Sequence, residues 1–514
     1  MASGTKKQRR KSRVIKIDLV ELQTIVDATS ERALSKGEQK VLQDAQQLIA
    51  RYALQSLNDE TSAAILGDDT DAPPKKKGPS KRNGRHPREA FVNAQTVKVP
   101  HPDFQPGQAC ACGCGKVYPL KRAIQFRHFV GQVPIEVTLY EMEQVRCNSC
   151  GQVFTAPLPE GVGPEPYDAT AVSTIALSKY GMGLPFYRQA AFLGALGTVI
   201  AASTQYEVVA AAAKKIEPAY NHLVEVAAQG KIGYFDDTSV KILDFVREEW
   251  DERTGLFTTG IVSVQEAFQI ALYFTGRDHA GENRAKLLKK RDPNLPGMIQ
   301  MSDALASNFS EIDSANELIA CCLTHGRRNF VKIIDSFPAD CRHVIRAIAS
   351  VYHHDSLSKE RGDNPEERLV FHQENSLPVM NDLKAWLDSH ITDKKAEPNG
   401  QLGKAIQYML NHWEPLTLFL RVPDAPLDSN AVERALKRVV LHRKNSLFYR
   451  SAKGAKTGDL YMSLIQTCQL NGVNPFDYLT ALQRNSVAMK TAPGDWMPWT
   501  FRATLEAQRA SPGP

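Results

Sequence analysis

The pattern of hydrophobic and polar residues changes several times along the chain, and each change predicts a different kind of element. Residues 17–29 and 34–57 follow helical spacing, and an S-x-x-E capping box opens the second stretch. A small helical hairpin and a dimerising pair of helices both fit this spacing. Residues 68–90 combine proline, glycine, lysine and arginine with almost no apolar content, which predicts a disordered linker over residues 68–96. We therefore expect a basic arm and helical region over residues 1–67, followed by this linker.

Two further patterns occupy the next part of the chain. Residues 97–160 show short strand-like alternation, as in HFVGQVPIEVTLYEMEQV, between two clusters of cysteines, which is typical of a small zinc-binding module. Residues 161–229 are rich in alanine and long apolar residues at helical spacing, with glycines between two helical runs. We expect a helical domain here. Both a helix-turn-helix that binds DNA and an ordinary helical bundle fit the pattern.

Beyond residue 230 the pattern becomes that of a sheet. GYFDDTSV, GLFTTGIVSV and QIALYFTG predict successive strands, and GMIQMSD follows after a helical connection. Residues 311–420 return to helical patterns, and SNAVERALKRVVLHRKNSLF predicts a further amphipathic, basic helix. We expect a domain of mixed strands and helices over residues 230–485 with a helical insertion at about 311–420, and a C-terminal tail over 486–514. The predicted fold class is therefore multidomain α+β.

Length and composition exclude several classes of protein. The 514 residues suffice for about three or four domains, so a single small binding module is excluded. Hydrophobic residues make up 42% of the chain and charged residues 23%, as in soluble globular proteins. No run approaches the length of a membrane span, and the basic N-terminus lacks the apolar stretch of a signal peptide. We expect an intracellular protein.

The nine cysteines are distributed like metal ligands rather than like a disulfide framework. Cys147-x-x-Cys150 has the spacing of half a structural zinc site. The other half falls in CACGCG, where Cys112 is the strongest candidate and Cys110 and Cys114 compete for the remaining position. Four thiolates would leave no open coordination position, so the predicted role is one structural zinc. The remaining cysteines lack such spacing and are expected to be buried apolar residues: Cys321, Cys322, Cys341 and Cys468.

Carboxylates stand at the ends of two predicted strands. Asp236 and Asp237 follow an apolar run in GYFDDTSV, and Asp303 has the same setting in MIQMSDALAS. A buried carboxylate must be paired, hydrogen-bonded or bound to a cation, so two such aspartates could converge on a metal. Glu433 lies on the predicted basic helix, where it could face the same site or form a surface salt bridge with Lys437. Spacing alone leaves both alternatives open.

The net charge of +6 is concentrated in a few segments. Such clusters often contact phosphate, although a solvated surface is the alternative for each. On the helix after Glu433 the candidate contacts to a DNA backbone are Arg434, Lys437, Arg438, Arg443 and Lys444. In the linker the candidates are Lys75, Lys76, Lys77, Lys81, Arg82 and Arg85.

At these residues the chain resembles the insertion sequence 66 family of transposases. FDDTSVKIL is similar to the strand that carries the family's first catalytic aspartate, QMSDALASN to the second, and LDSNAVERALKRVVLHRKNSLFYRS to the signature around its glutamate. THGRRNF, AIQYMLNHW and NGVNPFDYL resemble the flanking segments. The resemblance extends from the cysteine module to about residue 485. It departs from the family at Ser429, where a second asparagine is usual, in the shortened first cysteine pair and in the indistinct N-terminal zipper.

The resemblance implies a ribonuclease H-like catalytic domain and a DNA transposase of the DDE type. Carried over by position, the catalytic residues are Asp236, Asp303 and Glu433, with Asp237 as the alternative to Asp236. It implies two magnesium ions about 3.5 to 4 Å apart, for which manganese could substitute, in the cleavage and joining of DNA. The implied partners are the DNA ends of a mobile element, target DNA, further copies of the chain and accessory proteins of the same element.

Two rival functions remain open at the level of sequence. One is a metal-dependent nuclease on the same fold, which would cleave DNA without joining it. The other is a non-catalytic DNA-binding protein descended from a transposase, for which retention of all three carboxylates would have no purpose. The reaction products and the effect of Glu433→Gln distinguish these possibilities.

Overall fold

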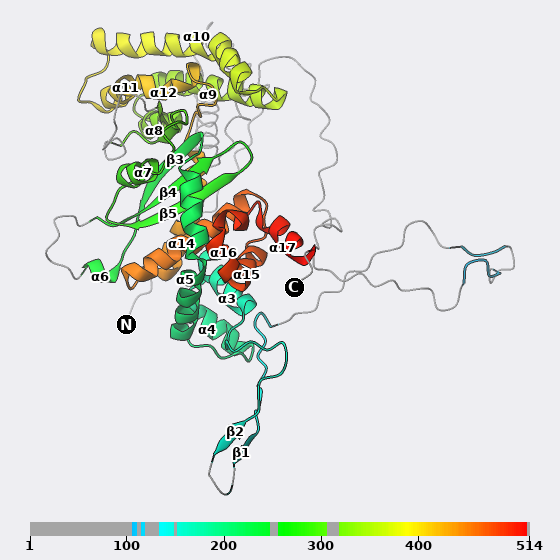
Figure 1. Ribbon diagram of the computed structural model, residues 1–514. Helices are drawn as coiled ribbons and strands as arrows, with labels where there is room; N and C mark the ends of the chain where they lie inside the picture. Colours follow the sequence, from blue (N-terminus) through cyan, green and yellow to red (C-terminus); the bar gives the residue numbers. More distant parts are fainter. Residues whose placement is uncertain are drawn as a thin grey trace, which may run out of the picture. The chain divides into compact units, whose positions relative to one another are not determined.

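The computed structural model describes residues 105–109, 115–118, 133–146, 148, 152–246, 255–305 and 318–510 (Figure 1). The predicted N-terminal helices, the basic linker and the five clustered cysteines lie outside these residues. The chain divides into two compact units, residues 67–132 and the remainder. In the first unit, the described residues Ala109 and Lys116 form an antiparallel bridge. The second unit contains the remaining elements and is described below.

A five-stranded mixed sheet forms the centre of the larger unit. Its strands are β3 (Ile232–Ser239), β4 (Phe257–Val264), β5 (Gln269–Gly276), β6 (Ile299–Ser302) and β7 (Leu318–Cys321). They lie in the order β5-β4-β3-β6-β7. β4 is antiparallel to β3 and β5, whereas β6 is parallel to both β3 and β7. Four of the strands confirm the sequence prediction. β7 falls where helical patterns were expected, because its four residues are too few to show an alternation.

Helices pack around the sheet in two groups (Figure 1). One core joins the sheet to the first and last helices of the unit. Those helices are α3 (Ala169–Ala176), α4 (Phe186–Ala195), α5 (Ala202–Ala227), α7 (Ala280–Leu288), α13 (Asn430–Ser446), α14 (Ala452–Leu470), α15 (Pro475–Arg484), α16 (Ser486–Thr491) and α17 (Phe501–Ala510). A second core joins β6 and β7 to α8 (Leu323–Lys332), α9 (Pro338–Arg361), α10 (Pro365–Thr392), α11 (Gln401–Asn411) and α12 (Trp413–Leu416). The short α6 (Leu243–Val246) follows β3. The protein is therefore of mixed α+β class.

The helical domain predicted over residues 161–229 corresponds to α3, α4 and α5. A π-helical turn, Leu177–Gly181, follows α3, and a glycine-containing turn separates α4 from α5, as the sequence predicted. In the preceding module the described strands are β1 (Gln144–Arg146) and β2 (Val153–Thr155), which form an exposed antiparallel pair. The alternation before β1 is not extended into a ladder over residues 133–143. A two-stranded ribbon with both faces exposed has no core that would stabilise longer strands. No helix among the described residues has both the length and the apolar character to cross a membrane.

The outer edge of β5 is covered by α14 through a ladder of side chains. An edge strand presents unpaired backbone N–H groups, which invite pairing with another chain. Four residues of a helix rise about 6 Å, close to the roughly 6.8 Å spanned by two strand residues, so polar side chains at every fourth position can match alternate strand amides. The acceptors and the strand residues whose N–H groups they bind are Asp459 with Thr275 (2.8 Å), Ser463 with Tyr273 (3.0 Å), Thr467 with Ala271 (3.1 Å) and Asn471 with Gln269 (3.0 Å). This ladder fixes α14 along β5 and closes that edge.

Asp459 makes this ladder sensitive to pH. Burial raises the pKa of the Asp459 carboxyl from 3.8 to about 7, although hydrogen bonds from Thr275 favour its ionised form. The folded state therefore binds this proton more tightly than the unfolded state does. The resulting stabilisation is fully present below about pH 4 and is lost as the pH rises through about 7.

We predict that Asp459→Asn reduces the loss of stability between about pH 5 and pH 8. The amide can accept from the Thr275 N–H and carries no charge, so the difference in unfolding free energy between these two pH values should fall by about 3 kcal/mol. Urea unfolding at the two pH values measures this difference. The control is Asp477→Asn on the exposed face of α15, which should leave it unchanged. Equal pH dependence in wild type and Asp459→Asn would show that the carboxyl is not protonated in the folded state.

Candidate active site

β3 directs Asp236 and Asp237 to opposite faces of the sheet. Successive side chains of a strand alternate between faces, and residues paired across strands share a face. Asp236 pairs with Gly260 of β4, and Asp237 pairs with Thr259. A Cβ atom on Gly260 would lie 2.7 Å from Cδ2 of Leu436, so α13 packs directly over Gly260. Asp236 therefore faces α13, and Asp237 faces the other side.

The carboxylate of Asp237 is used to hold the fold together. It accepts hydrogen bonds from Thr259 Oγ1 (2.6 Å) and from the backbone N–H of Ala280 (2.7 Å), and it lies 3.3 Å from His279 Nδ1. Ala280 is the first residue of α7, so Asp237 satisfies an amide at a helix N-terminus, where negative charge is favoured. Of the two adjacent aspartates, Asp236 is the one directed towards α13 and left without such contacts to a helix.

Asp236 lies in a partly buried, electronegative environment. Burial, together with the nearby Asp303 and Glu433 carboxylates, raises the pKa of its carboxyl from 3.8 to about 7, although the N–H of Asp237 (2.8 Å) and the nearby His325 favour the ionised form. The position of Asp303 follows from strand pairing. β3 and β6 are parallel with Tyr234 opposite Met301, so continuing the register by two residues brings Asp303 beside Asp236. The structure therefore brings these two aspartates together, as the sequence predicted.

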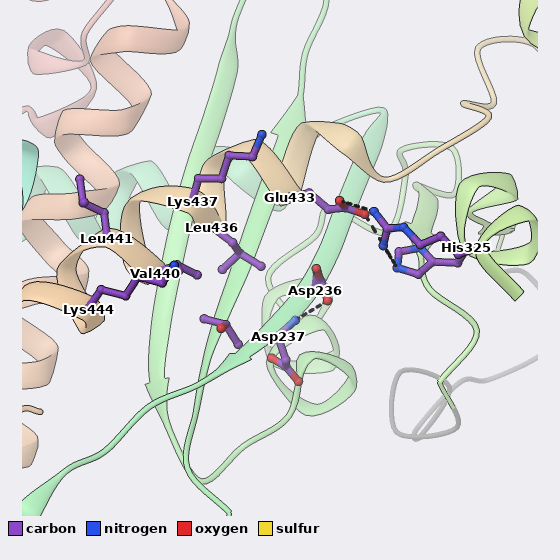
Figure 2. Close-up of a pocket in the computed structure, with 11 residues that line it drawn as sticks. Asp236, Asp237, His325, Glu433, Leu436, Lys437, Val440, Leu441 and Lys444 are labelled. Atoms are coloured by element: carbon purple, nitrogen blue, oxygen red, sulfur yellow. Dashed lines mark hydrogen bonds and ion pairs between the residues drawn. The ribbon is translucent and has the colours of Figure 1, made fainter. Parts of the chain in front are cut away.

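Glu433 approaches from the first turn of α13, confirming that it lies on a helix. Its carboxylate accepts from Arg328 Nη2 (3.1 Å) and Ser429 Oγ (3.5 Å). Arg328 Nη1 also lies 3.0 Å from His325 Nε2, and because arginine only donates, Nε2 must accept. Figure 2 shows the Glu433 carboxylate directed towards His325, whose Nε2 is 3.8 Å from Oε1.

Sequence reasoning assigned no role to His325 and Arg328 of α8. They belong to THGRRNF, which was noted only as a family-like segment, and they follow directly after the unpredicted strand β7. The available signal was a pair of basic residues three positions apart on one helical face. Without β7, nothing in the sequence placed that face beside Glu433.

A cavity of about 530 Å³ opens between the carboxylates and α13 (Figure 2). Its lining comprises Asp236, Asp237, Thr238, His325, Arg328, Glu433, Leu436, Lys437, Val440, Leu441 and Lys444. Three carboxylates near one another suit a divalent cation by charge and by their hard oxygen donors. Among the described residues, however, no three acidic, histidine or cysteine side chains are gathered around one point as metal ligands. Glu433 is instead turned towards Arg328.

The candidate DNA-binding cations of α13 differ in their surroundings. Arg438 donates to Gln466 Oε1 (2.8 Å), to the carbonyl of Gly181 and to Gln469, and it is therefore engaged in packing. Arg443 donates to Thr238 Oγ1 (3.1 Å) and to Ser239 at the end of β3. The residues that remain exposed are Arg434, Lys437 and Lys444. The linker candidates and the proposed zinc ligands lie outside the described residues, whereas Cys321, Cys322, Cys341 and Cys468 are buried, as predicted.

Comparison with known proteins identifies the family of this chain. The chain matches the Transposase IS66 family over residues 165–457, which include Asp236, Asp303 and Glu433. The uncharacterized protein y4jD of Sinorhizobium fredii is 27% identical in an alignment that covers 78% of this chain and 80% of that protein. The uncharacterized protein y4hP of the same species is 27% identical, with 81% and 79% covered. Because the family match spans more than half of the chain, the protein belongs to the IS66 family of transposases.

Proposed function

We propose that this transposase cleaves and joins DNA through a divalent-metal site formed by Asp236, Asp303 and Glu433. The observation that carries the proposal is the convergence of β3, the end of β6 and the first turn of α13, which are far apart in sequence. The order of the sheet supports a ribonuclease H-like catalytic domain. Its first three strands form an antiparallel meander, and the first of them also pairs in parallel with the fourth, β6.

The chemistry that a pair of Mg²⁺ or Mn²⁺ ions supplies when bound by such carboxylates is activation of a water or a DNA 3′-hydroxyl and stabilisation of the leaving oxygen. Asp236, Asp303 and Glu433 would hold these ions through hard oxygen ligands. Burial and the neighbouring carboxylates make the ionised form of Asp236 unfavourable, so positive charge at this place is strongly favoured. Asp237 fixes the end of β3 against α7, because its oxygens accept from Thr259 and Ala280.

Arg328 acts as a positioning residue for Glu433. The guanidinium donates to the carboxylate and to His325 at the same time, which fixes the direction from which Glu433 approaches the cavity. On the same side of α13, the exposed Lys437 and Lys444 would bind the phosphates of the DNA strand. Arg438 and Arg443 support this surface from beneath by holding α13 to α14 and to β3.

We also propose that one structural zinc is bound by Cys112, Cys147, Cys150 and either Cys110 or Cys114. The support is the Cys-x-x-Cys spacing followed by glycine and the strand-rich pattern between the clusters. In the sequence, Cys147 and Cys150 lie between the described strands β1 and β2, which pair with each other, as is usual for a zinc knuckle.

Glu433→Gln should abolish strand transfer by at least about 1000-fold while DNA binding remains, because the amide keeps the shape of the side chain but loses its charge. The assay joins the DNA that flanks the gene to a target plasmid in Mg²⁺ or Mn²⁺. Glu414→Gln, at an exposed position of α12, is the matched control. Wild-type protein that only shortens the DNA would instead be a nuclease. DNA binding by both proteins without cleavage or joining would favour the non-catalytic alternative.

Arg328→Ala should lower strand transfer by about 10- to 100-fold, since a misplaced catalytic group is costly even when present. Affinity for DNA should change little, and Arg328→Lys should recover part of the activity because it restores a donor to Glu433. The dependence of strand transfer on Mn²⁺ concentration would report whether the Glu433 carboxylate still reaches the metal site. Arg421→Ala, which removes the surface partner of Glu414, serves as the control. Unchanged strand transfer by Arg328→Ala would show that Arg328 does not position Glu433.

Cys147→Ser should remove the zinc that we expect at about one atom per chain, because a hydroxyl does not replace a thiolate in such a site. Elemental analysis of the desalted protein measures the metal content. Cys341→Ala, in the buried core of α9, should retain the zinc. Purified wild-type protein that contains no zinc, even when expressed with added zinc, would contradict the proposed module.

A further inference from the structure

The turn that follows α13 is strained and presents two apolar side chains to solvent. Leu447 has φ 65° and ψ −41°, a conformation that residues other than glycine rarely adopt. The N–H of Phe448 donates to the carbonyl of Ser446 (2.8 Å), so Leu447 is the central residue of a γ-turn of the rarer, positive-φ kind. The side chains of Leu447 and Phe448 are 66% and 44% exposed. Such strain persists where the surrounding structure imposes it, and it is common at functional sites.

The turn is firmly anchored on both sides. After it, Tyr449 is buried, its N–H donates to the carbonyl of Lys241 (2.8 Å), and its ring stacks on His442 at 5.0 Å. Before it, Ser446 Oγ accepts from the buried Lys179 Nζ (2.7 Å). The exposure of Leu447 and Phe448 is therefore a fixed feature of the fold rather than the result of a loose loop.

Exposed cations lie close to these apolar side chains in the sequence. Lys444, Arg450 and Lys453 are exposed and form no hydrogen bond or ion pair through their side chains with any residue that the structure describes. Leu441, one turn before Lys444, is 46% exposed. Exposed apolar side chains among unpaired cations match a nucleic acid strand with unpaired bases, since phosphates need the cations and base faces need the apolar surface. In a duplex, by contrast, the base faces are stacked away from such contacts.

The turn is continuous with the candidate active site. The cavity that contains Asp236 and Glu433 extends along α13 as far as Lys444, three residues before Leu447. Fourteen residues separate Glu433 from Leu447, which is about 21 Å along a helix. That length corresponds to about six base steps of 3.4 Å. One DNA strand can therefore contact both places.

We propose that Leu447 and Phe448 form a stacking wedge for unpaired bases of the DNA strand that runs along α13. The wedge deepens the proposed function, on which it rests, because it defines the substrate as DNA that is unpaired or unstacked next to the reacting phosphate. Lys444, Arg450 and Lys453 hold the phosphates of this strand, and the wedge contacts the faces of its bases. Apolar side chains that insert between bases favour distorted DNA in the same way.

The test compares the affinity of the full-length chain for two fluorescent DNA probes in the presence of EDTA, where no metal-dependent reaction occurs. One probe is a single strand of mixed sequence of about 12 nucleotides, twice the span from Glu433 to Leu447. The other is the same strand in a duplex. The double variant Leu447→Gly, Phe448→Ser removes the wedge, and glycine fits the positive φ at position 447 without strain. Phe448→Tyr keeps an aromatic face and is the conservative control.

Wild type should bind the single strand at least about 10-fold more tightly than the duplex, and the double variant should lose this preference while Phe448→Tyr retains it. Lys444→Ala should instead weaken binding of both probes and reduce its salt dependence. Equal preference in wild type and the double variant would overturn the proposal. So would a change of molecular mass in the double variant, because the apolar turn would then be an interface between copies of the chain. Glu433→Gln should keep the preference. Wild-type protein that shows the preference but transfers no DNA strand would contradict the catalytic function and leave the wedge in place.

Discussion

The close packing of α13 on β4 is the constraint on which the candidate site depends. Gly260 has no side chain, and a Cβ there would meet Leu436 at 2.7 Å and Val432 at 3.3 Å. This approach allows the first turn of α13 to lie over the same face of the sheet as Asp236, so that Glu433 reaches the cavity. A larger residue at position 260 would push the helix outward, because close-packed interiors tolerate added volume poorly. The site thus depends on a residue that carries no chemistry of its own.

The hydrogen bonds and charges around Asp236, Asp237 and Glu433 differ. Asp237 accepts hydrogen bonds from the N-terminus of α7 and from Thr259, whereas burial, together with the nearby carboxylates, raises the pKa of Asp236 to about 7. Glu433 has Arg328 as a counter-charge. Negative charge that is only partly compensated is a cost to stability that functional sites commonly carry, and it is the property that a cation-binding site requires.

The basic residues of α13 also differ in what their side chains contact. Arg438 and Arg443 satisfy carbonyl, amide and hydroxyl oxygens of the fold, and guanidinium groups suit this role because they donate several hydrogen bonds in a fixed plane. The exposed Lys437 and Lys444, with compact and strongly hydrated charges, line the cavity instead. These residues are equivalent in charge, but in the structure Arg438 and Arg443 hold the helix to its neighbours, whereas Lys437 and Lys444 are exposed at the cavity.

The sequence by itself determined the local elements and the chemistry that they could carry. Alternation over GYFDDTSV and helical spacing around Glu433 predicted β3 and α13, and the placement of carboxylates at strand ends identified Asp236 and Asp303. Strand β7 escaped prediction because its four residues are too few to show a period. Only the tertiary structure distinguished the surroundings of Asp236 from those of Asp237, which are adjacent in sequence but face opposite sides of the sheet. It alone brought Arg328 to Glu433 across 105 residues, since contacts between distant segments depend on how elements pack and leave no periodic signal in the chain.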